Sequence, residues 1–178
     1  MGNPGERITS YEDYPRYVPL LSNLLTLAIY AIGAYVLANF GLGVMVLYLV
    51  YCLWIESKVL SGSCTNCYYY GRICAFGKGR LCSLLLKRGD PEMFSEKEVS
   101  WWDILPDFMV SVFPIVGGVV LLIRDFAWLL AALLFALIVL SSAGTAFVRG
   151  SLACKFCKQG EIGCPAERLF NKQRRQEK

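Results

Sequence analysis

The cysteines of this chain occur in a pattern that repeats once, 90 residues further along the sequence. Each copy has the spacing C-x2-C-x6-C, and each follows directly on a long apolar segment. One duplicated unit, made of a membrane hairpin and a cysteine knuckle, would produce both features. The repeated residues are Cys64, Cys67 and Cys74 in the first copy and Cys154, Cys157 and Cys164 in the second.

Long uncharged segments predict four membrane spans. The chain is 56% hydrophobic, whereas soluble domains have roughly 45–50% apolar residues. The segments without Asp, Glu, Lys or Arg are 17–55, 108–123 and 126–148, and a spanning helix needs about 20 apolar residues. A helix of a soluble bundle keeps a polar face, which 130–140 (LAALLFALIVL) lacks. We expect spans at about 18–40, 42–60, 105–123 and 126–148.

These spans predict an all-α integral membrane protein, built from two tandem hairpins that are each followed by a C-x2-C-x6-C knuckle. The sequence then divides into five segments. We expect the polar residues 1–16 to be loosely ordered. The segments are an N-terminal segment (1–17), a first hairpin (18–60), a cysteine-rich loop (61–104), a second hairpin (105–148), and a knuckle with a basic tail (149–178).

The distribution of basic residues predicts the orientation. With four spans, 17 of the 18 Lys and Arg residues lie on one side, and only Arg124 lies on the other. An excess of Lys and Arg marks the cytoplasmic side, so we expect a multi-pass protein of the cell membrane with both termini and the loop cysteines in the cytoplasm. The basic tail fits this topology, and we do not expect nucleic-acid binding. The expected partners are the lipid bilayer and a cytosolic or membrane protein.

Spaced cysteines in the reducing cytosol more often bind metal or carry out redox chemistry than form disulfides. Zinc is the favoured ion, because C-x2-C turns with four sulfur ligands form closed structural zinc sites. An iron–sulfur cluster is the main alternative, followed by structural disulfides and a redox dithiol. Since the chain has no histidine, histidine-ligated sites and the usual general base are excluded. The candidate metal ligands are Cys64, Cys67, Cys74, Cys82, Cys154, Cys157 and Cys164.

Two partitions of these ligands are possible. In the first, each half closes its own site, and the first half uses Cys82 as its fourth ligand. The second half then lacks a fourth cysteine, because Lys172 stands where Cys82 would repeat. In the second partition, the halves pack about a pseudo-two-fold axis and share one ion. Cys64 and Cys67 then face Cys154 and Cys157 across it, with Cys74 and Cys164 nearby. The second partition is favoured because it uses the repeated cysteines alike.

Other positions give narrower expectations. Cys52 lies within the second span, too deep to join the loop cysteines, and is expected to be a core residue. Glu56 is expected at the membrane interface rather than as a buried functional acid. Pro114 should free a backbone carbonyl in the third span. Residues 80–88 predict a short helix that could lie in the headgroup plane with its aliphatic side towards the lipid.

The sequence favours a non-catalytic membrane protein, in which a cysteine-bound metal, zinc by preference, holds the cytoplasmic loops in one shape for docking or assembly of a complex. No catalytic residue is predicted, and enzyme activity is not favoured. The alternative is an electron-transfer protein with an iron–sulfur cluster. A small transporter built on a parallel repeat is the third hypothesis, for which the spans contain few polar residues.

Overall fold

The computed structural model describes residues 10–90 and 101–164, with Trp101 and Glu161 described by their backbones only. In these ranges the chain is helical, with turns and loops between the helices. The only strand-like pairing found there is one isolated bridge between Tyr11 and Cys157. The all-helical architecture expected from the sequence is therefore confirmed for the described residues.

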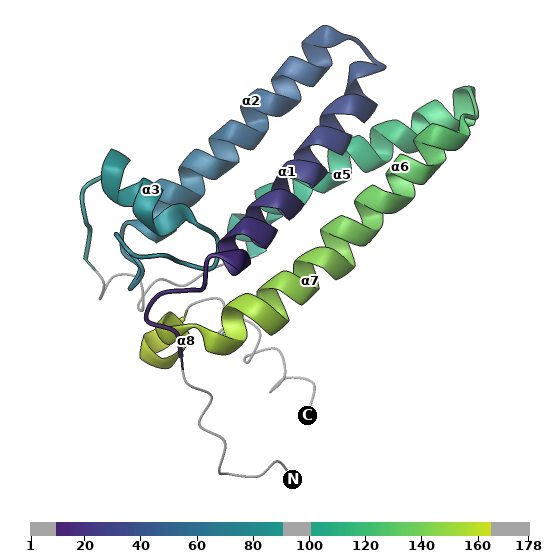
Figure 1. The fold of residues 1–178 in the computed structure, drawn as a ribbon. Coiled ribbons are helices and arrows are strands. Elements are labelled where there is room, and N and C mark those ends of the chain that lie inside the picture. Colours follow the sequence, from purple (N-terminus) through teal and green to yellow (C-terminus); the bar gives the residue numbers. More distant parts are fainter. Residues whose placement is uncertain (1–9, 91–100, 165–178) are drawn as a thin grey trace.

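Four helices form the long bundle in Figure 1, and each is long and apolar enough to cross a membrane. The second and fourth helices continue through π-helical turns without a break. They therefore extend further than the sequence indicated, to Cys64 and Phe156. The elements are α1 (Tyr17–Ala38), α2 (Leu42–Val59) with η1 (Leu60–Cys64), α5 (Trp101–Arg124), and α6 (Trp128–Val139) with η2 (Leu140–Gly144), α7 (Thr145–Phe147), η3 (Val148–Ala153) and η4 (Cys154–Phe156).

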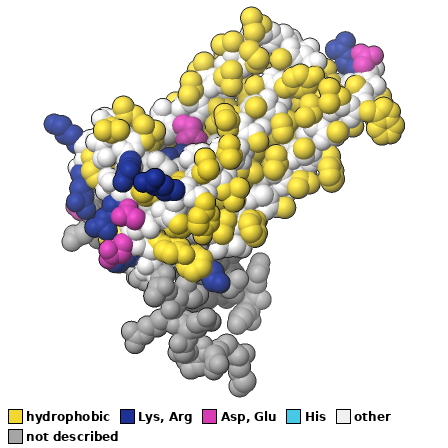
Figure 2. Space-filling model, viewed as in Figure 1, with side chains coloured by type: hydrophobic (Ala, Val, Ile, Leu, Met, Phe, Trp, Pro, Cys, Tyr) yellow, Lys and Arg dark blue, Asp and Glu magenta, His cyan; other side chains and the backbone are white. Residues whose placement is uncertain are grey.

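Helix α1 occupies the centre of the bundle and packs against α2, α5 and α6. The outward surface of the bundle is apolar along its length, as Figure 2 shows. Leu27, Leu47 and Phe135, for example, are 64%, 71% and 71% exposed. A contiguous apolar surface of this extent is typical of contact with lipid rather than with water. The four helices and this surface are those of a multi-pass membrane protein.

The interior of the bundle is fixed by a tyrosine that crosses between helices. Pro114 has no N–H to donate to the carbonyl of Val110, one turn earlier. The hydroxyl of Tyr48, on α2, donates to that carbonyl instead, at 3.0 Å. Gly33 on α1 makes room for it, because a Cβ there would lie 2.4 Å from the Tyr48 oxygen. The carbonyl that Pro114 was expected to free is thus occupied within the protein.

Two short helices accompany the cysteine segments: α3 (Lys78–Leu85) and α8 (Lys158–Gly163). The short helix expected at 80–88 is present, although it begins and ends earlier. Gly77 precedes it with a left-handed φ of 71°, and Leu86 ends it in an extended conformation. A left-handed residue before the first helical turn suits glycine, which has no Cβ to clash.

Candidate metal centre at the cysteine segments

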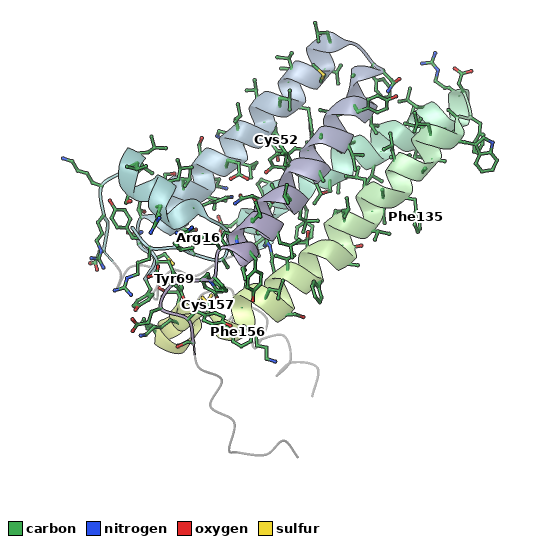
Figure 3. All side chains as sticks on the ribbon, in the orientation of Figure 1. Arg16, Cys52, Tyr69, Phe135, Phe156 and Cys157 are labelled. Atoms are coloured by element: carbon green, nitrogen blue, oxygen red, sulfur yellow. The ribbon has the colours of Figure 1, made fainter. Side chains whose placement is uncertain are left out.

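The two cysteine segments lie at the same end of the bundle, next to the start of α1 (Figure 1). Figure 3 places Tyr69 from the first segment close to Phe156 and Cys157 from the second, with Cys52 well away along α2. We use the name cysteine module for residues 10–16, 64–86 and 153–164. Segments that are distant in sequence therefore meet in one small region.

The two copies contact each other through a reciprocal pair of hydrogen bonds. The backbone N–H of Tyr68 donates to Oε1 of Gln159 at 2.8 Å. The backbone N–H of Lys158 donates to the hydroxyl of Tyr69 at 3.1 Å. Tyr68 corresponds to Lys158 under the 90-residue stride, and Tyr69 corresponds to Gln159. In each copy, the backbone N–H of the first of these positions donates a hydrogen bond, and the side chain of the second position accepts one from the other copy. Two units related by a two-fold axis make contacts of this reciprocal kind.

The turns at the two C-x2-C pairs are also alike. The N–H of Cys67 faces the carbonyl of Cys64 at 3.4 Å, and the N–H of Cys157 faces that of Cys154 at 3.3 Å. In each copy, a π-helical segment continues a long helix to the first cysteine: Cys64 is the last residue of one, and Cys154 directly follows the other. The local conformation is therefore similar at matched positions of the two copies.

The N-terminal segment joins the copies, and the expectation that residues 1–16 are loosely ordered is wrong for 10–16. The hydroxyl of the buried Tyr14 donates to the carbonyl of Ala153, and its N–H donates to the carbonyl of Ile73 at 2.9 Å. The N–H of Tyr11 donates to the carbonyl of Phe156 at 3.0 Å. Aromatic side chains in a polar stretch supply both apolar surface and hydroxyl donors, which is why this segment packs.

The thiols fall into two neighbourhoods that overlap. In the first, Cys64 is close enough to Cys74, Cys82 and Cys67 for their charges to interact. Cys82 is fully buried on α3, with its sulfur 3.7 Å from the carbonyl of Leu60. This neighbourhood is the ligand set of the within-half partition.

The second neighbourhood contains thiols from both copies. Cys67 is close enough to Cys157, Cys164 and Cys74 for their charges to interact, and Cys157 is similarly close to Cys164. Cys67 and Cys157 are equivalent positions under the stride, as are Cys74 and Cys164. The cysteine that remains, Cys154, is exposed. The structure therefore brings cysteines of both copies together, with Cys67 and Cys74 in both neighbourhoods.

Backbone N–H groups are directed at several of the sulfur atoms. Gly79 donates to the sulfur of Cys74 at 3.3 Å. The N–H of Tyr69 faces the thiol of Cys67, and those of Gln159 and Gly160 face the thiol of Cys157. Hydrogen bonds of this kind stabilise a thiolate. Such N–H donors suit sulfur atoms that become negatively charged when they bind a metal.

Burial has the opposite effect on these thiols. It raises the pKa of Cys67 to about 11 and also raises the pKa of Cys157 and of Cys82. These three thiols are consequently protonated near neutral pH. In the described part of the chain, no three Cys, Asp or Glu side chains are arranged to hold an ion. A metal would therefore have to displace the protons and draw the thiols inward.

Two residues of α2 that the sequence singled out lie outside the module. Cys52 is 2% exposed and packs with Tyr48 and Val110, so its expected role as a core residue is confirmed. Glu56 accepts a hydrogen bond from the hydroxyl of Tyr30 at 2.8 Å and forms an ion pair with Lys78. Its side chain is 25% exposed. Glu56 thus links two long helices to the start of α3.

The sequence did not assign an organising role to several residues that hold the module together. Tyr14, Tyr69 and Gln159 are 2%, 3% and 4% exposed and carry the contacts between segments. At Gly79 the backbone of α3 approaches the backbone of the first cysteine segment closely. A Cβ there would lie 2.2 Å from the carbonyl oxygen of Tyr69. The 90-residue stride could have pointed to Tyr69 and Gln159, since it places them at equivalent positions of the two copies. Nothing in the sequence pattern marks Tyr14.

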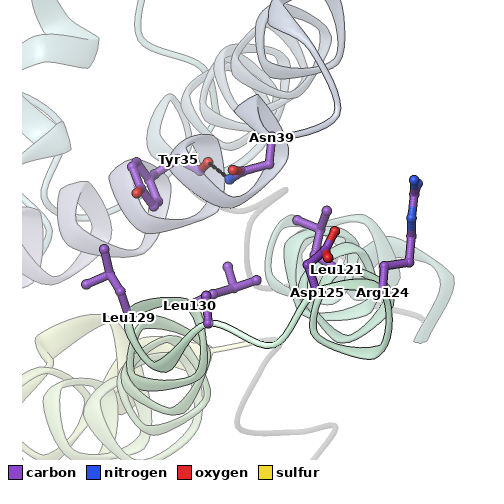
Figure 4. A pocket seen from close by; sticks show the side chains of 8 residues that line it. Tyr35, Asn39, Leu121, Arg124, Asp125, Leu129 and Leu130 are labelled. Atoms are coloured by element: carbon purple, nitrogen blue, oxygen red, sulfur yellow. Dashed lines mark hydrogen bonds between the residues drawn. The ribbon is translucent and has the colours of Figure 1, made fainter.

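A pocket of about 380 Å³ lies at the opposite end of the bundle. Figure 4 shows it between α1 and the turn that joins α5 to α6. Asn39 donates to the carbonyl of Tyr35 at 3.0 Å on one wall. Arg124 and Asp125 lie on the other wall, and both are exposed. The pocket is remote from all the candidate ligands of the cysteine module.

The chain was compared with protein-family models, with curated proteins and with solved structures. No family model matches it, and no curated protein or solved structure matches it either.

Proposed function

We propose that this chain is a non-catalytic membrane protein in which one zinc ion, bound by cysteines of both copies, holds the cysteine module in a single shape. The ligands are Cys67, Cys74, Cys157 and Cys164. The observation that carries the proposal is the reciprocal hydrogen bonding of Tyr68 with Gln159 and of Lys158 with Tyr69. It supports a duplicated unit that packs about an axis near Cys67 and Cys157.

The donor set suits zinc. Four sulfur ligands form a closed tetrahedral site that leaves no position open for a substrate. The N–H groups directed at Cys67, Cys74 and Cys157 would support the thiolates, as outer partners commonly do for metal ligands. Zinc would supply the link between the copies that the N-terminal segment also makes through hydrogen bonds.

The role of this shape is to present a fixed surface to a protein partner, or to complete a larger membrane complex. Both termini and the module face the cytoplasm in this proposal, because the basic residues gather at that end. The interior of the bundle favours a structural role over transport. Two of its tyrosines bond to helix carbonyls: Tyr48 to Val110, and Tyr51 to Pro106 at 2.8 Å.

Metal analysis of the anaerobically purified protein tests the proposal. We expect about one zinc per chain and a colourless solution, as for a single tetrahedral site. A brown protein that bleaches with dithionite would instead support the iron–sulfur alternative and a role in electron transfer. A protein without bound metal, alkylated readily at every thiol, would contradict both.

Single serine variants distinguish the two ligand partitions. In the shared site, Cys157→Ser and Cys164→Ser lose the metal, whereas Cys82→Ser retains it. In the within-half site, Cys82→Ser loses the metal and Cys157→Ser retains it. Cys52→Ser is the matched control, because Cys52 is buried in the bundle away from the module. It should retain the metal in either case.

A further inference from the structure

Helix α3 has one face against the protein and another that the protein leaves uncovered. Gly79 is buried against the backbone of Tyr69 and Arg72, and Cys82 is buried against η1, which continues α2. Leu81, Leu84 and Leu85 are 46%, 82% and 66% exposed. Their spacing of three and four residues places them on one side of the helix. Figure 2 shows apolar side chains over the region of α3 as well as along the long helices.

Two contacts fix the depth of α3 relative to the second span, which runs from Leu42 to Cys64. Lys78, the first residue of α3, pairs with Glu56, two turns before the end of that span. The sulfur of Cys82 lies 3.7 Å from the carbonyl of Leu60, one turn before the end. α3 therefore runs beside the last turns of the second span, where that helix would leave the bilayer.

Basic residues accompany the leucine face. Arg80 lies on α3, and Lys87 and Arg88 come just after its C-cap residue Leu86; all three basic residues are exposed. Basic side chains beside an apolar helix face are typical of helices that lie in the bilayer surface, because they meet anionic phosphate headgroups while the apolar face enters the acyl region. Both features of α3 thus match one occupant, an anionic bilayer surface.

We propose that α3 is an interfacial helix that binds anionic phospholipid. Leu81, Leu84 and Leu85 lie among the upper acyl chains, while Arg80, Lys87 and Arg88 contact the phosphate headgroups. Since Cys74 and Cys82 flank the start of α3, this contact also sets the cysteine module at the membrane surface. The proposal concerns residues outside the shared metal site and does not depend on a bound metal.

Photo-crosslinking of the full-length chain in vesicles tests the leucine contact. The vesicles contain phosphatidylcholine, phosphatidylglycerol and a little phospholipid with a diazirine near the top of one acyl chain. Adducts are located by mass spectrometry. Leu53, which is 67% exposed on α2, gives the yield of a lipid-facing residue, and the exposed Glu12 gives that of a residue in water. We expect the yield at 81–85 to be closer to that of Leu53. A yield closer to that of Glu12 would overturn the proposal.

Vesicle charge tests the headgroup contact. The adduct yield at 81–85 should rise when phosphatidylglycerol replaces part of the phosphatidylcholine, and the triple variant R80Q, K87Q and R88Q should lose that rise. Equal yields in neutral and anionic vesicles would overturn the assignment of an anionic lipid. Slow alkylation of the buried Cys82 in the variant confirms that α3 remains packed. If Cys82 becomes reactive, single variants at the three basic positions replace the triple variant.

Discussion

The membrane bundle and the cysteine module are stabilised in different ways. In the bundle, apolar side chains pack between the helices, and the hydroxyls of Tyr48 and Tyr51 donate to helix carbonyls of the third span. In the module, hydrogen bonds join segments that are 58 to 146 residues apart in sequence, from Tyr69 with Tyr11 to Lys158 with Glu12. The bundle therefore depends on the lipid and on helix shape, whereas the module depends on a few specific long-range contacts.

The difference implies that each region can be perturbed separately. Cys52 lies in the bundle, and Cys67 and Cys157 lie in the module. Alkylation of each cysteine by N-ethylmaleimide, located by mass spectrometry, then reports which region has opened. A variant that exposes thiols of both regions together would show that the two do not unfold independently.

The largest effect is expected from Gly79→Ala. The new Cβ would lie 2.2 Å from the carbonyl oxygen of Tyr69 and 2.6 Å from that of Arg72, and backbone atoms cannot move aside easily. Overpacking costs about 1–3 kcal/mol, and occasionally more, and a clash with two backbone carbonyls places this variant at the upper end of that range. We expect fast alkylation of Cys67 and Cys74 with Cys52 still protected. Gly150→Ala is the matched control, because nothing lies within 4 Å of its added Cβ.

Tyr69→Phe should have the next largest effect. Its hydroxyl accepts from the N–H of Lys158 at 3.1 Å and donates to the carbonyl of Tyr11 at 2.6 Å. Leaving a buried group unpaired costs about 1–3 kcal/mol. Both copies should then separate from the N-terminal segment, with faster alkylation of Cys67 and Cys157. Tyr70→Phe, which removes an exposed bond to Leu86, should change little. Equal effects of the two variants would argue against the reciprocal interface.

Tyr48→Phe tests the bundle. It leaves the carbonyl of Val110 without its donor, next to Pro114, and interhelical hydrogen bonds in membranes contribute about 1 kcal/mol. We expect a lower melting temperature in detergent and faster alkylation of Cys52, with Cys67 and Cys157 unaffected. The control Tyr35→Phe changes a half-exposed side chain. Protection of Cys52 that matches the wild type would show that the crossing tyrosine is not needed.

The bundle could be predicted from the sequence, because hydropathy is a local property. Uncharged segments gave four spans, and the position of Cys52 within one of them indicated a core residue. The ends of the spans could not be found in this way. The second and fourth helices pass through π-helical turns into Cys64 and Cys154, and composition does not mark where a helix stops.

The module could be predicted only in part. The 90-residue stride predicted that the two C-x2-C pairs face each other, whereas the structure brings Cys67 close to Cys157 and Cys164 and leaves Cys154 exposed. The stride did not show that the polar residues 10–16 would order, because their contacts are distant in sequence. Tyr14 bonds to Ala153 and Ile73, and neither partner carries a recognisable signal. Contacts between single residues that are far apart in the sequence produce no repeating pattern of hydrophobic or polar residues, so they cannot be predicted from the sequence pattern.

The smallest effect is expected from Glu12→Gln, at the outer edge of the module. Glu12 pairs with Lys158 at 3.0 Å, and the hydrogen bond from Lys158 lowers the pKa of the Glu12 carboxyl below its ordinary value of 4.5. A lowered pKa in the folded state means that the pair stabilises the module above about pH 4.5 and that this contribution is lost as the pH falls further. Exposed pairs contribute little, so alkylation of Cys157 at neutral pH should hardly change. Below pH 4.5, the alkylation rate of Cys157 should depend less on pH in the variant than in the wild type. An effect at neutral pH as large as that of Tyr69→Phe would mean that surface charge, rather than the buried tyrosine, joins the copies.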